Sequence, residues 1–130
     1  MSTDETRRLP VRNVPDMAIA GFVRLPMPSR RRGELWRFRV SMRNNSPGTI
    51  CLRGRKWVMS YANGEQRVVE ATQVFNCRPV LERGAVFSFG GEMPFPTPPE
   101  RVELRLFGED QLRSPFMTPP LVFPQRNRLR

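Results

Sequence analysis

Hydrophobic and polar residues alternate most clearly over residues 36–43, WRFRVSMR. The even positions carry tryptophan, phenylalanine, valine and methionine, whereas the odd positions carry arginine or serine. A period of two residues is typical of a β-strand with one buried face, because successive side chains of a strand point to opposite sides. The segment therefore predicts a strand whose exposed face is cationic and carries Arg37, Arg39 and Arg43.

Shorter apolar segments predict further strands at residues 18–25, 49–52, 56–62, 67–70, 85–89, 101–107 and 111–123. Residues 44–48, NNSPG, predict a turn, and residues 53–56 predict a second, cationic turn. The Asn63-Gly64 pair predicts a two-residue hairpin of type I′, which needs positive φ at both residues. Four prolines within residues 94–99 predict a stiff connection that stays outside the sheets.

Several short strands with turns between them and no helical period predict an all-β antiparallel sandwich of about seven to eight strands. A chain of 130 residues suits a single domain. We expect an extended N-terminal arm at residues 1–15, the sandwich at residues 16–124 and a basic tail at residues 125–130.

The chain is strongly basic, with 22 lysine and arginine residues against 12 acidic residues and a formal net charge of +10. Every basic residue except Lys56 is an arginine, whose planar guanidinium suits bidentate contact with phosphate or carboxylate. Codon bias in a GC-rich genome explains the lack of lysine equally well, but it does not explain the net charge. The charge favours a polyanionic partner or an acidic protein surface.

The basic residues form four groups: a loop after the first predicted strand, the exposed face of residues 36–43, the predicted turn at residues 53–56, and the C-terminal tail. The predicted RNA- or anion-binding residues are Arg30, Arg31, Arg32, Arg37, Arg39, Arg43, Arg53, Arg55, Lys56, Arg126, Arg128 and Arg130. Solvation alone is the alternative explanation of each group. The exposed face of residues 36–43 would form part of a larger anion-binding surface if residues 53–56 lay beside it on a neighbouring strand. No recognition motif for base edges is present, so contacts with nucleic acid would be with its backbone.

The composition excludes much catalytic chemistry. The chain has no histidine, and so lacks the commonest general base and the usual partner of a serine or cysteine nucleophile. Cys51 and Cys77 lack the CxxC spacing, and the acidic residues show no ligand cluster for a metal. No apolar run approaches the roughly 18 residues of a membrane span. We therefore expect no catalytic residue, cofactor, metal, small-molecule substrate or transmembrane segment.

Three runs, at residues 57–70, 78–89 and 119–124, resemble the ApaG domain family. They are WVMSYANGEQRVVE, RPVLERGAVFSF and the terminal PPLVFP, and the resemblance covers residues 22–124. It implies an immunoglobulin- or fibronectin-III-like sandwich. The domain stands alone in bacteria and is attached to F-box adaptors and to a polymerase-delta-interacting protein in eukaryotes. The resemblance therefore implies protein recognition rather than catalysis.

One segment departs from the family pattern. Family members carry G-x-G-x-x-G before the P-V-L element, whereas residues 71–76 here are ATQVFN and contain no glycine. A phosphate cradle needs glycine for close backbone approach and a helix that opens at the anion. We therefore expect no nucleotide at this segment. Phe75 gives it an apolar tip, which is a candidate protein contact unless it folds back onto the core.

The favoured hypothesis is a non-catalytic subunit of a large ribonucleoprotein of mitochondrial ribosome type. Its arginines would contact RNA phosphates, and its sheet edges would contact neighbouring proteins. The alternative is an accessory subunit or adaptor in a protein-only assembly, such as a mitochondrial respiratory complex, with acidic protein or lipid headgroups as the anion. An enzyme acting on phosphorylated substrates is the remaining class, which the missing histidine and glycines disfavour.

The first 14 residues leave the compartment open. They are arginine-rich, but they are neither amphipathic nor poor in acidic residues, as a mitochondrial presequence should be. They are a mature start, a weak presequence or an extension that orders on a partner. We favour the mitochondrial matrix over the cytoplasm and do not expect secretion.

Overall fold

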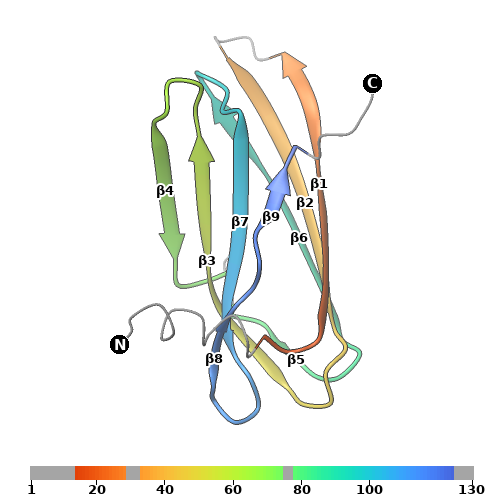
Figure 1. Ribbon diagram of the computed structural model, residues 1–130. Coiled ribbons are helices and arrows are strands. Elements are labelled where there is room, and N and C mark those ends of the chain that lie inside the picture. The colour runs from red at the N-terminus through yellow and green to blue at the C-terminus, as the bar shows by residue number, and fades with distance from the viewer. Residues whose placement is uncertain (1–13, 29–32, 75–77, 125–130) are drawn as a thin grey trace, which may run out of the picture.

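The computed structural model describes residues 14–28, 33–74 and 78–124, which form two antiparallel sheets packed face to face (Figure 1). Sheet A has the order β1-β2-β6, with β1 (Met17–Pro28), β2 (Glu34–Asn44) and β6 (Val86–Phe95). Sheet B has the order β4-β3-β7-β8, with β3 (Ile50–Ser60), β4 (Gln66–Ala71), β7 (Arg101–Glu109) and β8 (Pro115–Met117). In sheet B, β5 (Val80–Leu81) also pairs with β3, and β9 (Leu121–Phe123) pairs with β7.

The predicted all-β sandwich is thereby confirmed. The described residues contain no helix, and hence none long and apolar enough to cross a membrane. The N-terminal arm and the basic tail fall largely outside the described residues, so their predicted boundaries stay predictions.

Strand β2 has the burial pattern that its sequence predicts. Trp36, Phe38, Val40 and Met42 are buried, while the arginines and the serine between them are exposed. The buried face packs on sheet B, because the ring centroid of Phe38 lies 5.1 Å from that of Trp57 and 5.1 Å from that of Phe123. These aromatic contacts join the two sheets at the centre of the core.

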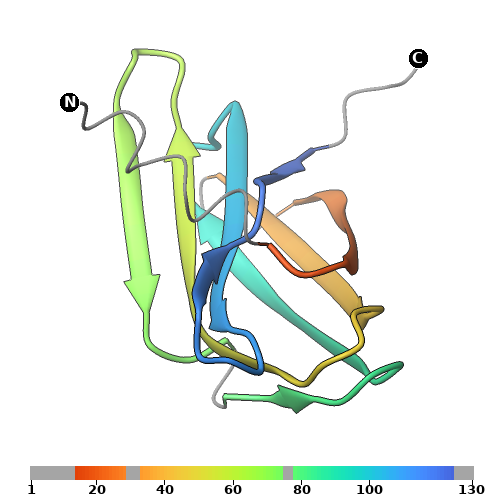
Figure 2. The same ribbon diagram turned by 60° about the horizontal axis from the view of Figure 1, so that its bottom comes forward.

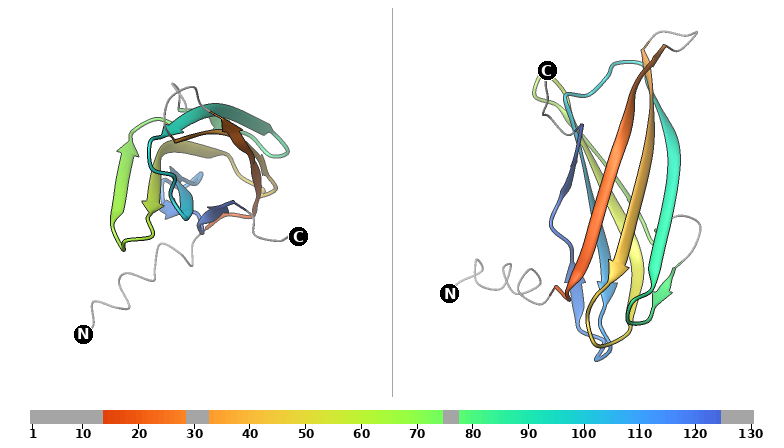
Figure 3. Two further views of the ribbon diagram at one scale, coloured as in Figure 1. Left: turned by 90° about the horizontal axis from the view of Figure 1, so that it is seen from above. Right: turned by 90° about the vertical axis from the view of Figure 1, so that its right-hand side faces the viewer.

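The sandwich is closed on one side and open on the other. On the closed side β1 packs against β9, and a Cβ at Gly21 would lie only 2.8 Å from Cδ2 of Leu121. On the opposite side β4 and β6 are the edge strands of their sheets (Figures 2 and 3). On the open side the inner face of β4 is therefore not covered by sheet A, and Val69 is 44% exposed.

The predicted cationic turn at residues 53–56 is wrong. Strand β3 runs without a break through these residues and contains a β-bulge between Leu52 and Gly54. Gly54 is buried there, where a Cβ would lie 2.5 Å from the carbonyl oxygen of Ala71. The glycine thus permits close backbone packing inside a strand rather than a reversal of the chain.

Two turn predictions also need correction. The hairpin at Asn63-Gly64 has three residues in its loop, since Tyr61 donates its N–H to the carbonyl of Glu65 and only Gly64 has positive φ (91°). Such a loop is a type I turn closed by a left-handed residue rather than a type I′ turn. Pro94 lies in β6, opposite Leu35, although we predicted it outside the sheets. The edge position tolerates proline because no strand needs its missing N–H.

The predicted turn at residues 44–48 is confirmed and is organised by one buried amide. Asn44 is fully buried, and its Nδ2 donates to the carbonyls of Gly48 and Leu81, each at 2.8 Å. Its Oδ1 accepts from the N–H of Ser46 at 2.9 Å and from the hydroxyl of Ser46 at 2.6 Å. Asn44 therefore ties the end of β2 to β5, which belongs to the other sheet.

We expect Asn44→Ala to lower the free energy of unfolding by about 2–4 kcal/mol, because it leaves several buried polar groups without partners. The measurement is urea denaturation followed by tryptophan fluorescence. The control is Asn45→Ala, an exposed neighbour that should change stability by less than about 0.5 kcal/mol. Equal stability of the two variants would contradict the role given to Asn44.

Candidate functional site

The outer surface of sheet A, which we call the arginine face, carries Arg37, Arg39 and Arg43 of β2. All three are exposed, as the sequence predicts. On the neighbouring strands β1 and β6, Phe22 and Gly90 lie opposite Arg39, and Ala18 and Val86 lie opposite Arg43. Three exposed arginines on one strand can contact an extended anionic partner.

The three arginines differ in their partners. Arg37 donates through Nε and Nη2 to one carboxylate oxygen of Glu92, at 2.9 and 2.7 Å. Among the described residues, no carboxylate forms an ion pair with Arg39 or Arg43. The side chain of Arg39 lies over Gly90, where a Cβ would be 3.4 Å from its Cδ and 2.9 Å from the carbonyl oxygen of Phe38. Two guanidinium groups thus remain available to an anion.

The sequence did not single out two apolar side chains of the same face. Phe22 on β1 lies opposite Arg39 and is 60% exposed, and Val86 on β6 lies opposite Arg43 and is 57% exposed. Residues that lie opposite each other on paired strands point to the same face of a sheet. Both side chains could therefore have been placed on the outer face only if the pairing of β1 and β6 with β2 had been known. Their exposure adds apolar contact area beside the arginines.

The predicted basic group at residues 53–56 lies in the other sheet. The neighbours of β2 are β1 and β6, so β3 does not extend the arginine face. Arg53 forms an ion pair with Glu109 at 3.3 Å, and Lys56 lies opposite Glu70 and Arg105 on the two neighbouring strands. Arg55 donates to the backbone carbonyls of Gln73, at 3.1 Å, and of Val74. Anion binding by these three residues stays a prediction.

Several predicted residues lie outside the described part of the chain. They are Arg30, Arg31, Arg32, Phe75, Arg126, Arg128 and Arg130, together with Cys77. Cys51 is a free, half-buried thiol. Within the described residues, no three histidine, cysteine, aspartate or glutamate side chains gather where they could hold a metal ion.

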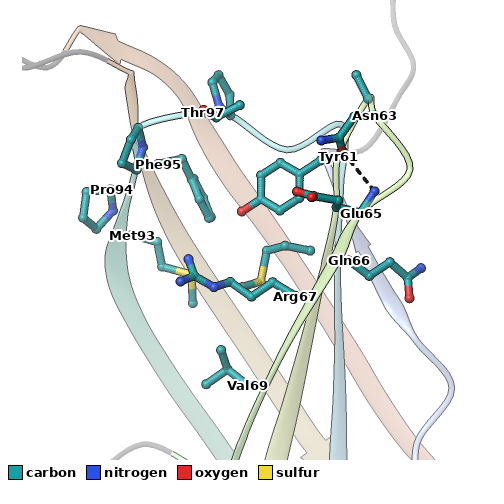
Figure 4. Close-up of a pocket in the computed structure, with 14 residues that line it drawn as sticks. Tyr61, Asn63, Glu65, Gln66, Arg67, Val69, Met93, Pro94, Phe95 and Thr97 are labelled. Carbon is teal, nitrogen blue, oxygen red and sulfur yellow. Dashed lines mark hydrogen bonds between the residues drawn. The ribbon is translucent and has the colours of Figure 1, made fainter.

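A groove of about 1070 Å³ opens between the β3–β4 hairpin and the end of β6 (Figure 4). We call it the β4–β6 groove, and its lining residues are Met59, Tyr61, Ala62, Asn63, Glu65, Gln66, Arg67, Val69, Met93, Pro94, Phe95, Pro96, Thr97 and Pro98. Met59 and Phe95 are buried and form its apolar base. Arg67 reaches from β4 toward Met93 on the opposite side (Figure 4). The groove therefore has an apolar base and a rim of mixed polarity, with a cation across it.

Comparisons with known proteins agree with this architecture. Residues 28–103 match the family model described as the ApaG domain. The chain is 35% identical to Protein ApaG of Brucella anthropi over 63 residues, which is 48% of each chain, and 31% identical to that of Maricaulis maris over 64 residues, 49% of each. The chain thus matches about half the length of these curated relatives.

A crystal structure of a Bordetella pertussis protein described as ApaA superposes with a TM-score of 0.74 at 19% identity. The superposition covers 86% of this chain and 98% of that one. At this identity the likeness shows the fold, and it confirms the predicted immunoglobulin- or fibronectin-III-type sandwich.

The structure gives Arg55 a role in stability that Arg53 does not share. We expect Arg55→Met to lower the free energy of unfolding by about 1–3 kcal/mol, because methionine keeps an apolar stem but loses the charged hydrogen bonds to two carbonyls. Chemical denaturation measures the change.

The matched control is Arg53→Met, which breaks one exposed ion pair and should cost about 0–1 kcal/mol. If the Arg55 variant were as stable as the Arg53 variant, the hydrogen bonds from Arg55 to residues 73 and 74, which follow β4, would not contribute to stability.

Proposed function

This chain belongs to the ApaG domain family, and on that premise we propose that it is a non-catalytic interaction module in a ribonucleoprotein of ribosome type. The family resemblance supports an interaction module. RNA is the partner that the arginine face suits best, because its phosphates present anions along an extended backbone. An acidic protein or a lipid surface is the alternative source of negative charge.

One observation supports the proposal: Arg39 and Arg43 are exposed on the same face of β2, and neither has an ion-pair partner among the described residues. Four residues of strand separate them by about 13 Å, at roughly 3.3 Å per residue. Each guanidinium offers a planar fork of donors to a phosphate. The contacts would be with the RNA backbone, since the described part of this face consists of strands and presents no helix that could enter a groove and read base edges.

Direct RNA binding tests the arginine face. We expect the double variant Arg39→Gln, Arg43→Gln to bind a fluorescent 20-nucleotide single-stranded RNA more weakly than the unchanged chain. The slope of log affinity against log salt concentration should become shallower by about 1.4, since each lost phosphate contact removes roughly 0.7. Fluorescence anisotropy between 50 and about 300 mM salt measures both effects.

The control removes two arginines elsewhere, with Arg101→Gln and Arg113→Gln. Both lie outside sheet A, and Arg101 is already paired with Glu103 at 2.8 Å. The control has the same net charge as the test variant and should keep the salt slope. If the slope of log affinity against log salt concentration were the same for the two double variants, the arginine face would not be the RNA-binding surface.

The assembly itself is tested by sedimentation of the native protein from a gentle lysate, with and without ribonuclease. We expect a large particle that breaks down after ribonuclease treatment. A large particle that resists ribonuclease would favour a protein-only assembly, and a free 15.1 kDa species would contradict a stable subunit.

A further inference from the structure

The two sheets do not cover each other on the side of β4. Arg67 and Val69 pair with Met59 and Trp57, so they point to the inner side of sheet B. Met59 and Trp57 are buried, yet Val69 is 44% exposed. The inner side of β4 therefore faces the β4–β6 groove where a sandwich with matched sheets would have another strand.

No described strand pairs with β6 on the same side. Asn44 donates its N–H to the carbonyl of Ala85, immediately before β6. Because bonded residues alternate along an antiparallel pair, the N–H and C=O groups of Ser88, Gly90 and Glu92 point away from β2. Among the described strands β6 pairs only with β2, so within the described residues these groups form an edge that can accept a further strand. Pro94 has no N–H and limits this edge at its upper end.

A small pocket opens beneath the double glycine of this edge. It has a volume of about 180 Å³, and its lining combines five apolar side chains with two charged residues and the two glycines: Phe38, Trp57, Val74, Phe89, Met93, Arg55, Glu92, Gly90 and Gly91. Gly90 and Gly91 put no side chain over its entrance. The pocket has the size and lining to receive one large apolar side chain, which is how buried anchors hold an extended partner.

The positive charge of Arg67 in the groove favours a partner that carries an acidic side chain. Arg67 reaches across it, and no ion pair to Arg67 is found among the described residues. Glu92, the acidic residue of β6, is bound to Arg37 on the outer face. Glu65 lies at the upper rim beside Tyr61 (Figure 4). A carboxylate at the level of Arg67 would therefore gain a partner, while a second cation there would be repelled.

We propose that the β4–β6 groove binds an extended acidic–apolar segment of a partner protein, which adds to β6 as a fourth strand of sheet A. Its inward side chains alternate with a period of two, so one bulky apolar residue enters the pocket beneath Gly90 and a carboxylate two residues away meets Arg67. None of Arg37, Arg39 and Arg43 lines the groove, so this proposal and RNA binding can fail independently.

The test selects displayed random eight-residue peptides on the full chain and then on the Arg67→Glu variant. We expect enriched peptides from the unchanged chain to carry aspartate or glutamate two positions from a bulky apolar residue. On the variant the acidic residue should be replaced by lysine or arginine. Arg101→Glu, a charge reversal on sheet B outside the groove, should leave the acidic pattern unchanged.

The best peptide is then examined with the isotope-labelled chain by NMR. We expect shifts in the amides of Gly90, Gly91 and Glu92, and at least roughly tenfold weaker binding when peptide nitrogens facing β6 are methylated. The proposal is overturned if no peptide is enriched, if methylation has no effect, or if the shifts fall on β1, at the far edge of sheet A, rather than on β6. A dimer of the free chain that Arg67→Glu dissociates would assign the groove to a second copy and would also overturn it.

Discussion

The packing of Phe38 between Trp57 and Phe123 is the contact on which the rest of the structure depends. It fixes which face of β2 is inside, and therefore which face presents arginine. A slip of one residue in the pairing of β2 would turn every arginine of the strand into the core, at a prohibitive cost in desolvation. The charged surface is thus a direct result of the aromatic core rather than an addition to it.

The sequence alone predicted the strands and turns whose local conformational preferences agree with their contacts in the folded protein. The alternation in β2 requires one buried and one exposed face, and both were predicted together with Arg37, Arg39 and Arg43. The turn at residues 44–48 was predictable because asparagine, serine, proline and glycine favour it locally. The buried amide of Asn44 then strengthens the same conformation by tertiary hydrogen bonds.

Other features depend on contacts between distant residues, which local patterns do not contain. In the sequence Gly54 looks like a turn residue. In the structure it lies inside the continuous strand β3, where only a residue without a side chain lets the backbone of Ala71 on β4 come so close. Pro94 belongs to a strand because β6 lies at an edge. The assignment of β3 to sheet B separates its basic residues from the arginine face, and the exposure of Phe22 and the β4–β6 groove follow from strand order.

The position of Phe123 in the chain has a consequence for synthesis. This residue is fully buried and contacts both Phe38 and Trp57, although it lies 85 residues after the first of them. Its strand β9 also pairs with β7 and packs on β1, which begins at Met17. During translation the core cannot close until residue 123 has left the exit tunnel of the ribosome. Until then the aromatic side chains of β2 and β3 stay exposed to solvent or to a chaperone.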